Sequence, residues 1–425
     1  MNYDVVVIGA GLSGLMAAAS AAREKKRVLV VARGMGIITI FTGGIDIFGY
    51  WPIEETEPLG SPLTGIQRLV AKDPDHPYAK VGIDAIKKGV RAFIDVAGKG
   101  GVEYVGDISQ NILIPTAVGT VKPTCLVSST MAGGDLRSER NVLICGFDGL
   151  RDFYPDYMAH NISTFEMGGL TLPRFRARVL KVDVGSRKSG INCLTLAGRF
   201  EDQGLLKLVT EEVYRHLRTG ERAAFPAVLG IRNSRDIHKK MEQTCGVPIF
   251  ETPTLPPSVP GYRLYKSLEE SLREMGVHML IGYDVYGPKT FGRRIGEISI
   301  AMGKSEKRVS GRAFILATGG LVGKGITASY DMLREPIFDL PVAAPKKRTD
   351  WFRKRLFDPA GHPINRAGII VDDHLRPVNK KGEPIYDNLL ACGTQLYGFD
   401  ALREKSGGGV AVSSGYKAGV EASRM

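Results

Sequence analysis

Three things are scarce in this sequence: paired cysteines, acidic residues and long apolar runs. The five cysteines lie far apart and form no C-x-x-C pair, so their spacing builds neither a zinc ribbon nor an iron–sulfur cluster. No apolar run reaches the roughly 20 residues that a membrane-spanning helix needs. The apolar stretch 5–22 contains glycines and has no basic residue before it, which argues against a secretory signal. Scattered thiols suit a reducing compartment, so we expect a cytoplasmic protein whose membrane contact is peripheral.

The deficit of acidic residues makes the chain basic. Lys and Arg number 57 against 45 Asp and Glu, a net charge of +12. Such a surplus favours anionic partners, although no recognisable nucleic-acid module is present and we expect no nucleic acid. With 425 residues, the chain is long enough for two or more domains.

The first 33 residues read as strand, tight turn, helix and strand. An apolar strand leads into Gly9, Gly11 and Gly14, which form G-x-G-x-x-G. Gly9 allows the turn, Gly11 lets the backbone approach a pyrophosphate, and Gly14 lets helix and strand pack closely. The helix N-terminus offers free N–H groups to the phosphates. This pattern predicts a dinucleotide-binding fold.

One residue of that pattern is missing. A carboxylate normally ends the second strand and contacts the adenosine ribose, but here the strand ends at Arg33. This argues against an ordinary NAD site. An arginine can meet a 2′-phosphate, so NADP stays open at this point.

The alternation of strands and helices restarts near residue 141. It continues to about residue 254, which predicts a second α/β unit. We therefore expect a nucleotide-binding domain made of residues 1–140 and 255–425, with residues 141–254 inserted as a cap domain.

Further motifs, most of which contain glycine, follow along the chain. They are the loop "FTGGIDIFGY", the turn "CGFDGLRDF", the segment "TLPPSVPGYRL", the strand end "LATGGLVGKGI", the segment "REPIFDLPV" and the helix start "YGFDALREKSGGGVAV". In this order the motifs resemble flavoproteins of the fumarate reductase and succinate dehydrogenase type. They resemble still more closely the B subunits of anaerobic glycerol-3-phosphate dehydrogenases. The fold class expected is thus α/β, a Rossmann-like flavin-binding domain with an inserted second α/β domain.

The resemblance implies a flavin cofactor and a set of residues around it. Family usage assigns FMN to these B subunits, whereas the dinucleotide motif favours FAD, and the sequence leaves the choice open. Arg33 suits either: FAD held without a ribose carboxylate, or FMN with no adenosine to hold. A positive helix end near the pyrimidine ring would stabilise the reduced flavin. The expected cofactor-binding residues are Gly9, Gly11, Gly14, Arg33, Thr42, Gly43, Gly44, Thr318, Gly319, Gly393, Gly407, Gly408 and Gly409.

The resemblance also implies partners. The enzyme complex to which such B subunits belong oxidises glycerol 3-phosphate to dihydroxyacetone phosphate during anaerobic growth and passes electrons to the quinone pool. Its A subunit carries the main oxidation and its C subunit carries iron–sulfur clusters. The chain would therefore be a flavin-dependent dehydrogenase subunit that lies on the inner face of the cell membrane.

Four residues near these motifs are candidates for catalysis. A phosphorylated substrate needs cationic groups, and Arg334 and Arg403 lie within the motifs. A base must take the hydroxyl proton, and His362 and His374 flank a strand-like segment. Each of the four has an ordinary structural interpretation as a surface, ion-pairing or packing residue.

The stretch 345–357, "PKKRTDWFRKRLF", combines six cations with Trp351, Phe352 and Phe357. One interpretation is contact with an anionic membrane surface, where each basic residue contributes about 1 kcal/mol. The other is a solvated basic loop whose aromatic residues enter the core.

Two other functions compete with that of a respiratory subunit. The chain could be a self-sufficient soluble flavin oxidoreductase that acts on another small acid or alcohol. It could also be a non-catalytic scaffold that anchors partners without a flavin.

Overall fold

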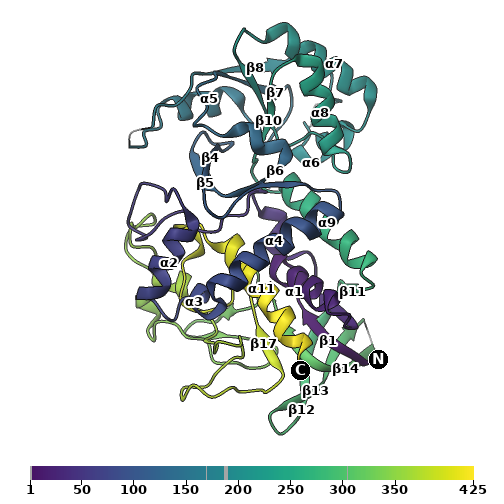
Figure 1. Cartoon of the computed structure of the whole chain (residues 1–425), viewed down its shortest axis with the longest axis vertical. Coiled ribbons are helices and arrows are strands. Elements are labelled where there is room, and N and C mark those ends of the chain that lie inside the picture. The colour runs from purple at the N-terminus through teal and green to yellow at the C-terminus, as the bar shows by residue number, and fades with distance from the viewer. Residues whose placement is uncertain (1, 169, 186–189, 304) are drawn as a thin grey trace. The chain divides into compact units, whose positions relative to one another are not determined.

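The computed structural model describes residues 2–168, 170–185, 190–303 and 305–425, and the chain forms two compact units (Figure 1). The first unit consists of Met1–Ile38, Asp46–Gly100 and Leu268–Met425. The second consists of Thr39–Ile45 and Gly101–Ser267. The predicted inserted domain, residues 141–254, falls inside this second unit.

The first unit is built on a seven-stranded sheet. Its order is β11-β2-β1-β14-β13-β12, and β17 also pairs with β14. All pairings among β11, β2, β1, β14 and β17 are parallel, whereas β12, β13 and β14 pair antiparallel. The strands are β1 (Asn2–Ile8), β2 (Val28–Ala32), β11 (His278–Ile281), β12 (Asp284–Phe291), β13 (Arg294–Met302), β14 (Ser305–Leu316) and β17 (Leu389–Ala391).

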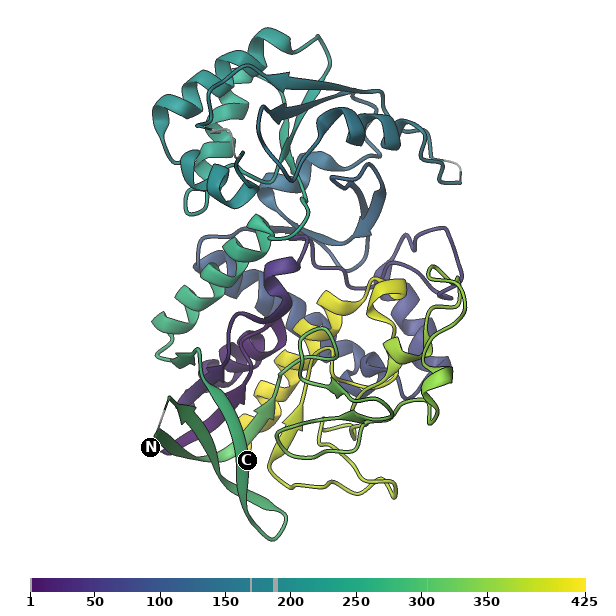
Figure 2. The same cartoon turned by 180° about the vertical axis from the view of Figure 1, so that it is seen from behind.

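Helices cover one face of this sheet (Figures 1 and 2). Helix α1 (Leu12–Arg23) and helix α11 (Gly407–Ser423) pack on each other and on β1 and β14, and α4 (Ile83–Lys99) packs on α11. Strand β2 is buried along its whole length, as expected for a covered parallel sheet. The remaining elements of the unit are α2 (Pro62–Lys72), α3 (Pro77–Val81), β15 (Thr327–Ala328), β16 (Leu333–Arg334), η3 (Arg348–Asp350), η4 (Pro363–Arg366) and α10 (Ala401–Glu404).

The second unit contains a four-stranded parallel sheet in the order β10-β9-β7-β8. Its strands are β7 (Val142–Phe147), β8 (Phe175–Leu180), β9 (Arg222–Pro226) and β10 (Ile249–Thr252). Its helices are α5 (Pro155–Ser163), α6 (Cys193–Arg199), α7 (Gln203–His216) and α8 (Ser234–Cys245). Four short strands and a 3₁₀ helix complete it: β3 (Tyr104–Gly106), β4 (Ile112–Pro115), β5 (Val121–Thr124), β6 (Leu126–Ser128) and η2 (Ser129–Gly134). Two elements cross the division between the units, η1 (Gly36–Ile40) and α9 (Val259–Glu274).

The alternation of strands and helices expected between residues 141 and 254 is present in the structure. Residues 60–80 are rich in proline and polar residues, which favours a surface loop, but they form helices α2 and α3. Helix α5 begins at Pro155, because proline fits the first helical position and stops a helix that would run through it. The β12–β13 hairpin is not among the elements predicted from the sequence. Every residue of β12 is exposed or half-buried, so its apolar residues give little signal of a strand. Among the described residues, none of the helices combines the length and the apolar character needed to cross a bilayer.

Candidate functional site

The turn between β1 and α1 forms a cradle for phosphate. Gly9 has a φ of +117°, and a β-carbon there would collide with the carbonyl oxygen of Ala317. A β-carbon at Gly14 would collide with the carbonyl oxygen of Gly9. At Gly11, by contrast, a β-carbon would meet no protein atom within 4 Å. Gly9 and Gly14 therefore close the turn tightly, and Gly11 leaves its outer side open to a ligand.

The N-terminus of α1 suits an anion. Its N-cap is Gly11, no side chain caps it, and no acidic residue lies in its first turn. The first amides of a helix lack partners within the helix and carry a partial positive charge. Together with the open side of Gly11, these amides fit the phosphate groups of a nucleotide.

Helix α11 runs beside α1 in the same direction. Glycines make this contact close, because β-carbons at Gly415 and Gly419 would collide with the carbonyl oxygens of Ser13 and Ala17. Gly407 precedes Gly415 by eight residues, so α11 extends about 12 Å past the level of Ser13 at 1.5 Å per residue. The positive ends of both helices thus open at the same end of the sheet, one beyond the other.

Two further predicted glycines shape the same region. Gly393 has a φ of +85° and its amide donates to Ser414 Oγ of α11 at 2.9 Å. Gly409 needs the absence of a side chain, since a β-carbon would collide with the Tyr78 hydroxyl and lie 2.8 Å from Ile47 Cα. Gly408 is buried in the first turn of α11, while Gly407 is half-buried.

Thr318 and Gly319 follow β14 directly. Thr318 Oγ1 donates to Gln395 Oε1 at 2.9 Å, and the amide of the next glycine, Gly320, donates to Thr394 Oγ1 at 3.1 Å. These bonds join the end of β14 to the loop after β17. The two loops lie at the carboxyl ends of adjacent parallel strands, where ligands bind in open α/β sheets.

The predicted glycine loop 42–44 belongs to the second unit. Its Gly43 carbonyl accepts a hydrogen bond from the Tyr104 hydroxyl at 2.8 Å, and Lys122 Nζ donates to Thr42 Oγ1 at 2.5 Å. The side chain of Lys122 is buried, with only 8% of the residue exposed. Burial also raises the pKa of Tyr104, although the positive charge of Arg263 opposes this increase. A β-carbon at Gly44 would lie 2.9 Å from Thr124 Oγ1. Sequence reasoning missed Lys122 and Tyr104, because nothing in the chain order links them to this loop.

Arg263 and Tyr104 line a small pocket in the second unit. Arg263 forms a buried two-bond ion pair with Glu251, with side-chain exposures of 3% and 0%. Burial raises the pKa of Glu251, but the charge and hydrogen bonds of Arg263 outweigh burial and hold it below its ordinary value. Thr130 Oγ1 also donates to this carboxylate, at 2.7 Å.

Arg33 does not lie free at the end of β2. Its guanidinium pairs with Asp284 at the start of β12, and both side chains are at least half exposed. A carboxylate therefore lies beside the end of β2 after all, contributed by a strand far away in sequence.

Three of the four catalytic candidates are engaged in local structure. Arg334 is 62% exposed and pairs with Asp339. His374 is 61% exposed and pairs with Glu421 near the C-terminal end of α11. At His362, Nδ1 accepts the Arg353 amide at 3.1 Å and Nε2 lies 2.9 Å from the Leu356 carbonyl oxygen. With both ring nitrogens engaged by one loop, His362 braces that loop and has no nitrogen left for use as a base.

Arg403 differs from the other three. Its Nη2 donates to the carbonyl oxygens of Ile53 and Pro359 at 3.1 and 2.6 Å. Its Nε is buried and has no hydrogen-bond partner among the described residues. Arg403 lies on α10, four residues before the start of α11, so it is the one candidate that keeps an unused donor near the glycine helix.

Comparisons with known proteins identify a family for the chain. The family model described as "FAD binding domain" matches residues 4–410. The probable B subunit of anaerobic glycerol-3-phosphate dehydrogenase from Halobacterium salinarum is 31% identical over 99% of this chain and 98% of that protein. The corresponding protein of Vibrio cholerae is 28% identical over 98% and 96%. Among solved structures, a 3-ketosteroid Δ1-dehydrogenase from Sterolibacterium denitrificans has 11% identity and a TM-score of 0.48, with 100% of this chain and 99% of that chain covered.

The family model spans nearly the whole chain, and the cradle at the first turn of α1 fits the nucleotide of a flavin cofactor. The likeness to the glycerol-3-phosphate dehydrogenase proteins covers both units. The chain therefore belongs to the FAD binding domain family and, within it, to the B subunits of anaerobic glycerol-3-phosphate dehydrogenases.

Proposed function

We propose that this chain holds FAD and serves as the flavoprotein subunit of a respiratory enzyme that oxidises glycerol 3-phosphate and delivers electrons to quinone. The observation that carries the proposal is the phosphate cradle at Gly11, in a chain that resembles B subunits along nearly its whole length. Bound flavin would supply the hydride acceptor. The residues of this chain would orient it and stabilise its charge.

The spacing of the two helix ends favours FAD over FMN. The N-terminus of α1 provides a phosphate site, and that of α11 lies about 12 Å further along. A mononucleotide has one phosphate and no adenosine, so it would leave the end of β2 without a ligand. The Asp284 carboxylate beside Arg33 gives that end a group able to accept hydrogen bonds from ribose hydroxyls.

This preference is tested by denaturing the purified protein and identifying the released flavin by chromatography. We expect FAD, close to one per chain, because the cradle fits a pyrophosphate. FMN as the main product would contradict the assignment and indicate that the adenosine half of the fold is vestigial. No flavin, after a check for loss during purification, would favour the scaffold.

The state of the catalytic candidates supports a subunit that depends on partners. Arg334, His362 and His374 are held by neighbours on their own loops or helices. Of the four candidates, only Arg403 keeps a buried donor without a partner among the described residues, and an arginine cannot act as a base. We therefore propose that a catalytic A subunit performs the main oxidation and that an iron–sulfur C subunit carries electrons onward.

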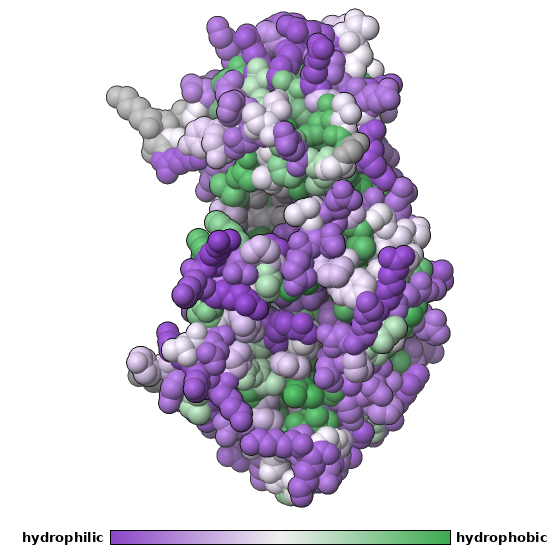
Figure 3. Space-filling model, turned by 90° about the vertical axis from the view of Figure 1, so that its left-hand side faces the viewer, coloured by the Kyte–Doolittle hydropathy of each residue, from purple (hydrophilic) through white to green (hydrophobic). Residues whose placement is uncertain are grey.

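The stretch 345–357, here called the basic loop, has a surface suited to an anionic membrane. Trp351 is buried and donates to the Pro345 carbonyl oxygen at 3.0 Å, so one aromatic residue does enter the core. Phe352, Leu356 and Phe357 are 59%, 77% and 88% exposed. On the face drawn in Figure 3, hydrophobic residues form small patches among hydrophilic ones. We propose that these three apolar side chains enter the bilayer interface while the cations bind lipid headgroups.

A liposome assay checks this role of the basic loop. Changing Phe352, Leu356 and Phe357 together to serine should weaken binding to vesicles of anionic lipid several-fold, because their apolar surface no longer leaves water. Phe291→Ser is the matched control: it removes a phenyl ring that is 65% exposed and lies near Lys289. Equal binding by the triple variant and the control would remove the proposal.

A further inference from the structure

A histidine and a glutamate are buried together beneath the first turn of α11. His76 Nε2 lies 3.1 Å from Glu404 Oε2, and the two side chains are 1% and 5% exposed. His76 is the N-cap of α3, whereas Glu404 ends α10. The pair therefore joins a helix of the N-terminal half of the chain to the loop that precedes the glycine helix.

The hydrogen bonds of His76 fix where its proton lies. Nδ1 accepts the backbone N–H of Tyr78 at 3.0 Å, so that nitrogen carries no proton. Nε2 then bears the hydrogen and donates it to Glu404. The imidazole is thus a neutral donor with one fixed direction.

Glu404 passes this constraint to the N-terminus of α11. Ser406 Oγ donates to the same carboxylate oxygen at 2.8 Å, and the Asp400 amide donates to the other oxygen at 2.9 Å. Ser406 is the N-cap of α11, and its hydroxyl caps no amide of the helix. Lys405, which lies between Glu404 and Ser406, has a φ of +51°. This conformation costs free energy for a residue with a side chain and persists only when its surroundings hold it.

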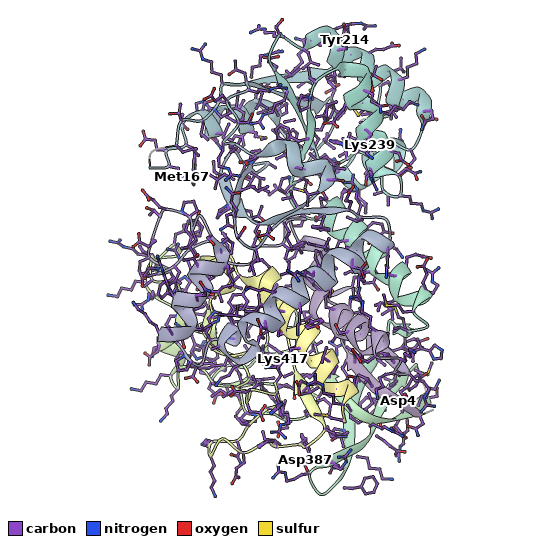
Figure 4. All side chains as sticks on the ribbon, in the orientation of Figure 1. Asp4, Met167, Tyr214, Lys239, Asp387 and Lys417 are labelled. Atoms are coloured by element: carbon purple, nitrogen blue, oxygen red, sulfur yellow. The ribbon has the colours of Figure 1, made fainter. Side chains whose placement is uncertain are left out.

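Other contacts fix α3 against α11 along its length. The Tyr78 hydroxyl donates to the Ile47 carbonyl and leaves room beside it only for Gly409. Lys417, labelled in Figure 4, donates from α11 to the carbonyl oxygens of Lys80 and Val81 at 2.6 and 3.2 Å. Helix α3 is therefore a fixed support. Both its N-cap His76 and Tyr78, whose hydroxyl also lies 3.5 Å from the Ser406 carbonyl oxygen, reach the start of α11.

We infer that His76, acting through Glu404 and Ser406, is a positioning residue that sets the reduction potential of the flavin. The inference rests on the flavin part of the proposed function. The positive end of a helix stabilises negative charge only near its first turn. If the first turn of α11 moves away from the flavin, the reduced anionic ring therefore loses stabilisation.

The test compares the flavin midpoint potential of the purified wild-type protein with that of His76→Phe and His76→Gln, after the flavin content of each is measured. His76→Phe keeps an aromatic ring, slightly larger than imidazole, but removes both hydrogen bonds. We expect its reduction equilibrium to become about tenfold less favourable, a fall of roughly 30 mV for a two-electron couple. His76→Gln can still donate to Glu404 and should restore most of the difference.

A second His–Glu pair, which lies near the other end of α11, provides the control. His374 Nδ1 lies 3.1 Å from Glu421 Oε2 and is largely exposed. His374→Gln should leave the potential unchanged. Ser406→Ala should lower the potential in the same direction as His76→Phe, and it decides the matter if His76→Phe does not fold.

Three results would overturn the inference. One is a wild-type potential in flavin-loaded His76→Phe, even with a lowered melting temperature, since that would mean a purely structural role. Another is an unchanged potential in Ser406→Ala. The third is wild-type protein without flavin, which would overturn the proposed function as well.

Discussion

Changing Gly11 to alanine should remove most of the bound flavin while leaving the protein folded. Gly11 has a φ of −75° and a ψ of 177°, which alanine adopts without strain, and its β-carbon would meet no protein atom within 4 Å. The same methyl group would occupy the open side of the cradle, where the phosphate must approach the backbone. We expect at least a tenfold loss of flavin affinity, about 1.4 kcal/mol or more.

Two variants bracket this result. Gly60→Ala is the neutral control, because Gly60 is exposed and its β-carbon would also meet nothing within 4 Å. Gly14→Ala should damage the fold itself, since its β-carbon would collide with the Gly9 carbonyl. The measurement is the ratio of flavin to protein after purification, together with the melting temperature. Full flavin content in Gly11→Ala would place the phosphate elsewhere.

The sequence predicts the tight turn between β1 and α1 because its signals are local. Gly9, Gly11 and Gly14 lie within six residues, each with a separate steric reason. The contact between α1 and α11 also depends on a local spacing, since Gly415 and Gly419 stand four residues apart on one helix face, although our sequence predictions did not include it. Such spacings survive in the chain order, so a reader can find them without a structure.

The supports of the site could not be predicted in the same way. His76 and Glu404 are 328 residues apart, and Lys122 lies 80 residues from Thr42. Each partner alone resembles an ordinary polar residue, and only the fold brings the pair together. The same reasoning applies to Arg33, whose partner Asp284 lies 251 residues away on another strand.

The catalytic candidates show that a sequence signal can be present at a residue that has a structural role. His362 lies beside a strand-like segment, yet its two ring nitrogens are engaged by the Arg353 amide and the Leu356 carbonyl oxygen. A histidine used in this way gives the same sequence signal as a catalytic base. Sequence position therefore cannot separate the two roles, whereas the hydrogen bonds of both nitrogens do.

The oxidation of glycerol 3-phosphate should depend on a catalytic partner of this chain. Within the described residues, no imidazole among the predicted catalytic residues is both buried and free to act as a base beside the glycine helix. Hydride transfer from an alcohol requires such a base to take the hydroxyl proton. If an A subunit performs the main oxidation, as proposed, this chain should bind flavin and exchange electrons but should not oxidise glycerol 3-phosphate by itself.

The most direct test of this account is to add glycerol 3-phosphate, without oxygen, to the flavin-loaded chain and follow the flavin absorbance. We predict no bleaching by substrate with this chain alone, and bleaching once the A subunit is added. Dithionite, which reduces free and bound flavin, should bleach the flavin in both samples. Full bleaching by glycerol 3-phosphate in the absence of the A subunit would contradict the account and identify the chain as a self-sufficient dehydrogenase.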